Sequence, residues 1–313
     1  MKTRAPLVTL LASLALSTVC APVAAESYDA HSRLADFQPE EARYPQPDSV
    51  ADAIYFASRV TSVDYGYLLA QAQLESSMNP NAQAPTSSAS GLFQFIKSTW
   101  ISTLGRHATR FALDRFGQHI AHTSSGQYFV PDKAMRRKIL ALRFDPRIAS
   151  LMAASLAADN RDRLRHALNR TPKSSELYLA HFLGARGAIS FLLNLERRPW
   201  EKASALFPAA ARANARIFYE RNGSPRSLAS VMNVIRSKFE RARRHVAYRY
   251  PVNASYAQLL EASLRRDHRP QPYVIVDEDV FALEWTTRAS PQNLVHQRAD
   301  AEQLHLWPLD ASM

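Results

Sequence analysis

The 313-residue chain is long enough for one large domain or two smaller ones, and 46% of its residues are apolar, which excludes a chain that is disordered throughout. Eighteen prolines against eight glycines, with long stretches rich in Ala, Leu and Arg, favour a helical protein over a β-sandwich or barrel. The net charge of +11 suits a polyanionic partner, such as a bacterial wall polymer, an anionic lipid surface or nucleic acid.

The N-terminus has the composition of a signal peptide. A positively charged start is followed by a 13-residue apolar run, 7–19, and by small residues at 23–25. The apolar run is shorter than the roughly 20 residues of a transmembrane helix. We therefore expect removal of residues 1–25 on export, which leaves no cysteine because Cys20 is the only one. Export predicts a periplasmic location and argues against nucleic acid as a partner.

Periodicity and capping residues predict a mainly α protein. After a flexible, proline-containing lead-in over 26–47, helices are expected in chain order over 51–60, 64–78, 91–104, 132–143, 146–169, 171–184, 187–195, 207–219 and 227–245. Residues 273–276 form the one strand-like run. We expect one helical domain over 48–222, followed by a helical extension with a poorly ordered tail over 223–313.

Glu75 is the candidate catalytic residue. On the expected helix 64–78 it follows an apolar stripe that contains Leu68 and Ala72, because residues three, four and seven apart share a helix face. A carboxyl group in apolar surroundings loses water contacts, which favours the protonated form that a general acid needs. Pro80 ends the helix just beyond, so Glu75 is expected at the rim of a cleft. The alternative is a solvent-exposed glutamate at a helix end.

After the expected helix 64–78 comes a loop over 81–90, and the stretch 87–95 has the residue types of a sugar-binding segment. Ser88 lies in a run of small residues, which lets a bulky ligand approach the backbone closely. Gln94 can donate and accept hydrogen bonds, as sugar hydroxyl and N-acetyl groups require. Phe93 offers an apolar face to a sugar ring, with core packing as the alternative for it and its aromatic neighbours.

Together these motifs resemble the catalytic region of the family 1 lytic transglycosylases (glycoside hydrolase family 23, with a soluble-lytic-transglycosylase-like, lysozyme-like catalytic domain). Glu75-Ser76 and Gly91-Leu92-Phe93-Gln94 match the family's Glu-Ser and Gly-Leu-Met/Phe-Gln elements, and the resemblance covers roughly residues 50–200. It implies that Glu75 is the catalytic acid. It also implies a substrate-binding set made of Ser76, Ser88, Phe93, Gln94 and His181.

His181 belongs to the third element of the resemblance. Residues 180–184 correspond to the family's Ala-Tyr-Asn-x-Gly segment, but His181 stands at the position of the tyrosine and Phe182 at that of the asparagine. This variant resembles a subgroup of exported and phage muramidases. We expect His181 to act in the site in the tyrosine's place, next to Glu75. The alternative is that it packs beside Leu177.

The resemblance implies a reaction on the glycan strands of peptidoglycan. Family members cleave the β-1,4 bond from N-acetylmuramic acid to N-acetylglucosamine with one glutamate, which acts first as acid and then as base while a 1,6-anhydro ring forms. Ordinary glycosidases use two carboxylates, and the matching region holds no second acidic motif. No cofactor is expected. No metal is expected either, because His119 and His122 lack further residues in a zinc-binding pattern.

Two other functions stay open. One is a hydrolytic lysozyme-type muramidase on the same fold, and the other is a wall-binding assembly protein without activity. A basic run over 236–249 is either a solvated helix face or a contact for wall polymer, an anionic membrane surface or a protein partner. A flagellar or secretion assembly is a partner compatible with the first function.

Overall fold

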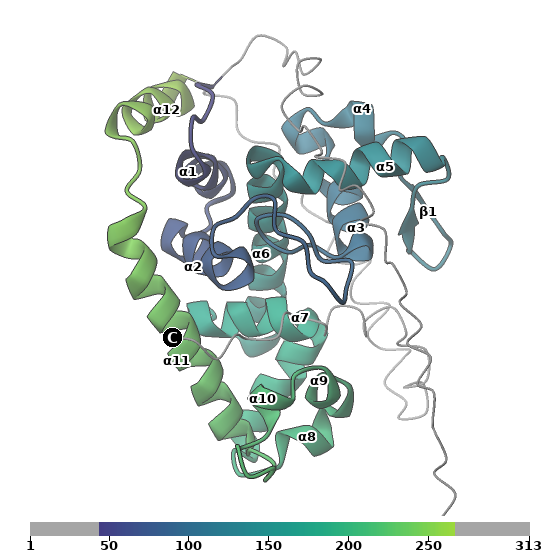
Figure 1. Cartoon of the computed structure of the whole chain (residues 1–313), viewed down its shortest axis with the longest axis vertical. Coiled ribbons are helices and arrows are strands. Elements are labelled where there is room, and N and C mark those ends of the chain that lie inside the picture. The colour runs from purple at the N-terminus through teal and green to yellow at the C-terminus, as the bar shows by residue number, and fades with distance from the viewer. Residues whose placement is uncertain (1–43, 267–313) are drawn as a thin grey trace, which may run out of the picture. The chain divides into compact units, whose positions relative to one another are not determined.

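The computed structural model describes residues 44–266, which belong to one of the two units of the chain, residues 38–313. The expected signal peptide over 1–25, the lead-in up to residue 43, the strand over 273–276 and the tail after residue 266 lie outside the described residues. Helices make up most of the described part (Figure 1), which confirms the predicted mainly α fold.

The longer elements follow the predicted order. The helices are α1 (Val50–Thr61), α2 (Tyr65–Ser76), α3 (Lys97–His107), α4 (Asp114–Gly117), α5 (Lys133–Ala141), α6 (Pro146–Leu168), α7 (Ser174–Arg197), α8 (Ala203–Leu206), α9 (Pro208–Ala213), α10 (Ala215–Phe218), α11 (Leu228–Arg249) and α12 (Ala254–Arg266). Two short 3-10 turns are η1 (Thr109–Phe111) and η2 (Leu142–Phe144), and the antiparallel hairpin β1 (Ala121–His122) and β2 (Tyr128–Phe129) lies between α4 and α5.

The long helix α6 is the centre of the described part, with α1, α3 and α7 packed against it (Figure 1). Its N-terminus is capped by Asp145, whose carboxylate accepts hydrogen bonds from the next two free backbone N–H groups, and Pro146 occupies the first turn. Small buried side chains, including Ala57 of α1 and Ala149 of α6, let the helices approach closely. The apolar core therefore forms around α6.

The sequence-based helix over 91–104 is wrong in its first half. Residues 91–96 form a loop, and α3 begins at Lys97. Gly91 has a φ of 79° and Gln94 a φ of 48°, both in the left-handed region, which an α-helix does not contain. The helix expected to run to Met78 also ends earlier, at Ser76, because Ser77 and Met78 have positive φ angles.

Two further helix boundaries differ from the prediction. The helices expected over 171–184 and 187–195 correspond to the two halves of α7, which begins at Ser174 and not at Thr171. The predicted break between them is confirmed, because Gly184 has the non-helical angles φ 72° and ψ 159°. Glu176 accepts a hydrogen bond from the backbone N–H of Lys173 at 2.8 Å and so sets the true start of α7. The helix expected over 207–219 is divided at Asn214 into α9 and α10.

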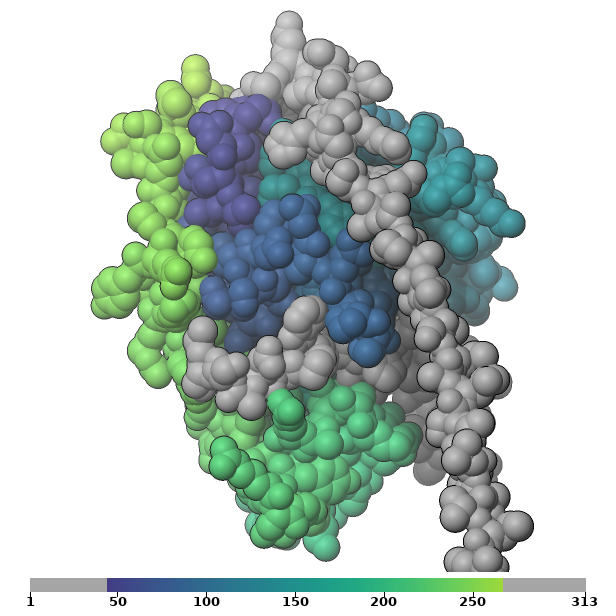
Figure 2. Space-filling model, viewed as in Figure 1, coloured from purple at the N-terminus to yellow at the C-terminus, as the bar shows by residue number. Residues whose placement is uncertain are grey.

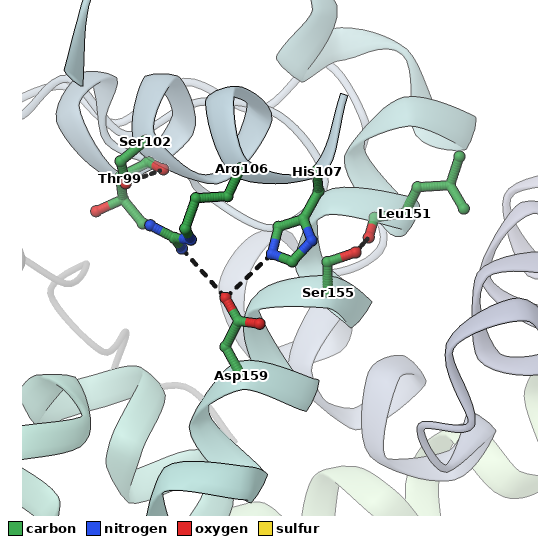
Figure 3. A network of polar contacts seen from close by, with 7 residues as sticks. All are labelled: Thr99, Ser102, Arg106, His107, Leu151, Ser155 and Asp159. Atoms are coloured by element: carbon green, nitrogen blue, oxygen red, sulfur yellow. Dashed lines mark hydrogen bonds and ion pairs between the residues drawn. The ribbon is translucent and has the colours of Figure 1, made fainter. Parts of the chain in front are cut away.

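The junction between α3 and α6 is cross-linked by Asp159. Arg106 Nη2 and His107 Nε2 of α3 donate to Asp159 Oδ2 of α6 at 3.3 and 3.0 Å, and Figure 3 shows both side chains pointing at this oxygen. Burial alone would raise the pKa of Asp159, but the hydrogen bond from His107 and the charges of His107, Arg106 and Arg163 outweigh it and hold the pKa below its usual value. The ionised carboxylate therefore ties the two helices together.

The C-terminal helices pack onto the rest of the described part. Figure 1 shows α11 running along α2 and α7, and the space-filling view in Figure 2 shows the end of the described chain lying against the N-terminal helices. Tyr65 Oη donates to the backbone oxygen of Tyr250 at 3.1 Å, and Arg59 of α1 forms an ion pair with Glu261 of α12. The predicted extension, as far as it is described, thus shares a core with the helices before it.

Among residues 44–266, no helix has both the length and the apolar character needed to cross a membrane.

Candidate active site

Glu75 lies in the last turn of α2 and is almost fully buried, with 4% of the residue exposed. Asp64 caps the start of α2 by accepting a hydrogen bond from the N–H of Tyr67 at 2.7 Å. The preceding turns of the same face are apolar, and Leu68 and Ala72 are fully buried. Helical spacing therefore carries Glu75 into the core, as the sequence pattern predicts, instead of onto a solvated helix end.

The two side chains that contact the Glu75 carboxylate both come from α7. Tyr178 Oη donates a hydrogen bond to Glu75 Oε1 at 3.3 Å, and His181 Nε2 lies 3.2 Å from the same oxygen. Residues 178 and 181 are three apart and so share one face of α7. Their rings are stacked with centroids 6.0 Å apart. The contact expected between His181 and Glu75 is thus present in the structure.

Tyr178 is the hydrogen-bond donor of this pair. Burial raises the pKa of the Tyr178 hydroxyl well above its usual value, and the negative charge of Glu75 raises it further. The phenol therefore keeps its proton, which points at the carboxylate. Phe239 of α11 packs against the Tyr178 ring, with centroids 5.4 Å apart, and helps to hold Tyr178 in place.

His181 links Glu75 to Gln71, which lies one helical turn earlier on α2. The side-chain nitrogen of Gln71 is 3.1 Å from His181 Nδ1. If the amide donates there, Nδ1 is the acceptor and the ring proton is on Nε2, the atom facing Glu75. The 3.2 Å between His181 Nε2 and Glu75 Oε1 permits an ion pair, but the two groups are not aligned for a hydrogen bond. Within residues 44–266, His181 Nε2 and Gln71 Oε1 are both buried without hydrogen-bond partners.

The Ser76 hydroxyl joins α2 to the following loop. Ser76 Oγ donates to the backbone oxygens of Leu92 and Ala72 at 2.7 and 3.2 Å. The predicted role of Ser76 in holding Glu75 or the substrate stays a prediction. Its hydrogen bonds in the structure fix the loop beside the end of α2, immediately next to Glu75.

Gln94 braces the same loop from inside. It is 4% exposed, and its side-chain nitrogen donates to the backbone oxygens of Gly91 and Ala82 at 2.9 and 3.1 Å. Its side-chain oxygen is buried and has no hydrogen-bond partner among residues 44–266. That free acceptor is the atom through which Gln94 could meet a donor group on a ligand, so its predicted binding role stays a prediction.

Ser88 and Phe93 occupy different environments. Ser88 is half-buried, and its hydroxyl accepts a hydrogen bond from the N–H of Lys97 at 3.3 Å, at the start of α3. Phe93 is 1% exposed. Their predicted contacts with substrate stay predictions, and the burial of Phe93 favours core packing for this ring.

Arg143 of η2 was not singled out by the sequence, yet it holds the outer part of the loop. Its Nη1 donates to the backbone oxygens of Ser88 and Phe95 at 2.6 and 2.9 Å, and burial lowers its pKa to about 10. A Cβ atom at Gly91 would lie 1.9 Å from the backbone oxygen of Arg143. The glycine of the Gly-Leu-Phe-Gln motif is therefore required by this close approach and by its positive φ.

A lysine of α11 interacts electrostatically with Glu75. Lys238 of α11 is half-buried and directly precedes Phe239, the residue packed against Tyr178. Burial lowers the pKa of Lys238, the charge of Arg241 lowers it further, and the negative charge of Glu75 opposes both. Sequence reasoning treated Lys238 as one member of a basic run, because no local motif connects it with Glu75.

The described residues contain no group of three or more His, Cys, Asp or Glu side chains that could hold a metal ion. His122, half of the pair considered in the sequence, lies in strand β1 and is exposed.

The comparison with protein families is consistent with this geometry. Residues 52–114 match the family described as "SLT: Transglycosylase SLT domain". The matched range contains α1, α2, the loop with the Gly-Leu-Phe-Gln motif and α3, and ends before the α7 side chains that contact Glu75. The match, together with the helical architecture, supports a lysozyme-like fold and an enzyme of the lytic transglycosylase and lysozyme-like superfamily.

Proposed function

We propose that this protein is a peptidoglycan lytic transglycosylase in which Glu75 acts alone, first as acid and then as base. The observation that carries the proposal is the burial of the Glu75 carboxyl group against Tyr178 and His181. The family match over residues 52–114, which contains Glu75, supports a transglycosylase. The substrate is the β-1,4 bond from N-acetylmuramic acid to N-acetylglucosamine, as the resemblance of the motifs implies.

In the first step, protonated Glu75 gives its proton to the oxygen of the glycosidic bond. The bond from that oxygen to C1 of the muramic acid breaks, and the substrate's own N-acetyl group stabilises the positive charge at C1. Glu75, which is almost fully buried, is then left as a carboxylate. The hydrogen bond from Tyr178 stabilises this carboxylate, because a neutral donor bonds more strongly to a charged acceptor than to a neutral one.

In the second step, the Glu75 carboxylate removes the proton from the C6 hydroxyl of the same sugar. O6 then bonds to C1 and closes the 1,6-anhydro ring, and Glu75 regains its proton for the next cycle. No water enters the reaction, so no second carboxylate is needed to activate one. A single buried acid with fixed hydrogen-bonding partners suffices for both proton transfers.

The rival function is hydrolysis on the same fold. A hydrolytic glycosidase normally places a second carboxylate across the bond, as base or nucleophile. The part of the sequence that resembles the family contains no second acidic motif. We therefore propose ring closure instead of hydrolysis, and the products of digestion distinguish the two.

We also propose that the enzyme acts in the periplasm. The signal-peptide-like start of the chain would bring it to the wall, and the positive charge of the remaining chain suits an anionic polymer. Local opening of the wall for a flagellar or secretion assembly is compatible with this setting. Cell fractionation checks the location: the N-terminally processed protein should be found in the periplasmic fraction, and retention of the unprocessed protein in the cytoplasm would contradict it.

The activity is tested by digesting purified peptidoglycan and identifying the soluble products by mass spectrometry. We expect products with 1,6-anhydro-muramic ends, formed at least about 10²-fold more slowly by the Glu75→Gln variant. Products with reducing ends would support the lysozyme instead. If the wild-type protein sediments with wall material but releases no product, the inactive wall-binding function is the right one.

A further inference from the structure

Helix α11 contributes a charged side chain to the surroundings of Glu75. α11 packs along α2 and α7, the two helices that hold Glu75 and its partners (Figure 1). Phe239 is fully buried between them, with its ring 5.6 Å from that of Tyr67 and 5.4 Å from that of Tyr178. Lys238 is the neighbouring residue, at the edge of the buried face of α11, and is itself half-buried.

Lys238 has no counterion in direct contact in the part of the chain that the structure describes. Within residues 44–266, no carboxylate lies within ion-pair distance of its ammonium group, whereas Arg243 on the same helix is 3.7 Å from Glu240. Glu75 is close enough to interact with Lys238 electrostatically, but the contacted oxygen of Glu75 already meets Tyr178 and His181. A partly desolvated ammonium without a partner gains free energy when an anion binds to it.

The proposed substrate carries such an anion next to the bond that is cleaved. The lactyl group of N-acetylmuramic acid ends in a carboxyl group, which is free in a bare glycan and amide-linked to the stem peptide in the intact wall. The stem peptide has carboxylates of its own. Both sources present the same chemistry, a carboxylate attached to the sugar whose C1 reacts.

We propose that Lys238 binds a substrate carboxylate carried by the muramic acid residue and so determines specificity for muramic acid over neutral N-acetyl sugars. This inference rests on the proposed function, since it takes peptidoglycan as the substrate. Lys238 then serves binding, while Glu75 carries out the proton transfers. Lys238→Gln removes the positive charge and should raise KM for carboxylate-bearing strands on the order of tenfold, because one charge-assisted hydrogen bond is lost. The value of kcat should stay nearly unchanged.

The test compares wild type, Lys238→Gln and the control Arg244→Gln, which removes the same charge from an exposed position on α11. Three substrates are used: soluble strands with stem peptides, strands stripped of peptides by an amidase, and stripped strands whose carboxyl groups are converted to neutral amides. We expect Lys238→Gln to raise KM on the charged strands only, and Arg244→Gln to match wild type. A loss on stripped strands identifies the lactyl carboxylate, and a loss only on peptide-bearing strands identifies the stem peptide.

Two results would overturn the inference. Equal KM values for wild type and Lys238→Gln on every substrate exclude carboxylate binding. A fall in kcat that is the same on charged and neutral strands shows that Lys238 acts on Glu75 instead.

Binding is measured in parallel with Glu75→Gln, alone and combined with Lys238→Gln, so the comparison does not depend on turnover. An absence of wild-type product on all strands contradicts the proposed function. A binding difference between the two Glu75→Gln proteins confined to charged strands still supports Lys238 as the carboxylate contact, and no difference overturns it.

Discussion

The surroundings of Glu75 and of Asp159 contain similar kinds of side chain but affect the two carboxyl groups differently. Each contains a carboxyl group near a histidine, on helices that pack in the core. Asp159 is 24% exposed at its side chain and accepts hydrogen bonds from His107 and from a permanently charged Arg106 (Figure 3). Glu75 is 3% exposed at its side chain and meets a neutral phenol and a histidine that is not aligned for a hydrogen bond.

Under the proposed function, this difference separates a structural carboxylate from a reactive one. The cations around Asp159 hold its pKa below the usual value and so keep it ionised as a link between α3 and α6. Near Glu75, the Lys238 ammonium lies outside ion-pair distance, and the closest partners can accommodate both the acid and the carboxylate. A group that must donate and regain a proton in each cycle needs surroundings that do not strongly favour one of its two forms, the acid or the carboxylate.

The largest expected effect comes from exchanging the two carboxyl groups for amides, one at a time. Glu75→Gln should lower the rate of product release from peptidoglycan by about 10²- to 10⁴-fold, because an amide cannot donate the proton. Asp159→Asn is the matched control. Its rate per folded molecule should stay within about twofold of the wild-type rate, because Asp159 contacts Arg106 and His107 and shares neither with Glu75. A Glu75→Gln rate within about tenfold of the wild-type rate would show that another residue is the acid.

Tyr178→Phe tests the hydrogen bond that distinguishes the Glu75 site. The variant keeps the ring that packs on Phe239 and removes only the hydroxyl at 3.3 Å from Glu75 Oε1. We expect kcat to fall about tenfold, because the carboxylate formed after proton donation loses one charge-assisted hydrogen bond. Circular dichroism should show an unchanged helix content, and an unchanged kcat would remove Tyr178 from the account.

Asp159→Asn should lower the free energy of unfolding at pH 7 by about 1–2 kcal/mol, measured by urea denaturation. The amide leaves the positive charges of Arg106 and Arg163 without the carboxylate that balances them. Glu75→Gln should not cause this loss. The substitution removes a buried carboxyl group whose one basic neighbour within ion-pair distance, among residues 44–266, is His181. Equal destabilisation by the two variants would end the distinction between the sites.

The smallest expected effect is the dependence of the Asp159 contribution on pH. The pKa of Asp159 is lower in the folded protein than its usual 3.8, so its stabilisation is fully present above pH about 4 and is lost as the pH falls through the folded value. The difference in unfolding free energy between wild type and Asp159→Asn should therefore narrow steadily below pH about 4. A difference that stays constant down to the lowest pH would show that packing, not charge, explains it.

The sequence predicted the candidate site residues that are local in the chain, and their roles stay predictions. Glu75, Ser76 and Gln94 lie within one helix end and one loop, so spacing and motif place them together. His181 was predicted from a motif on a distant helix, and its position opposite Glu75 is confirmed at 3.2 Å. Tyr178 lies on the same face of α7 as His181, three residues earlier. This three-residue spacing is the one sequence signal that could have identified Tyr178.

Other features depend on tertiary packing and had no local signal. Lys238 and Phe239 reach the site only because α11 folds back along α2 and α7. The positive φ angles of Gly91 and Gln94 exclude a helix before Lys97, although the neighbouring residues suggest one. The buried guanidinium group of Arg143, in η2, stabilises the loop that forms there instead.

The most direct test of the central claim is digestion of peptidoglycan in water labelled with a heavy oxygen isotope, followed by mass spectrometry of the released fragments. If Glu75 closes the anhydro ring, the new muramic ends are lighter by one water molecule than reducing ends and contain no label. Incorporation of labelled oxygen at those ends would show that water attacks C1, and would contradict the single-glutamate transglycosylase mechanism.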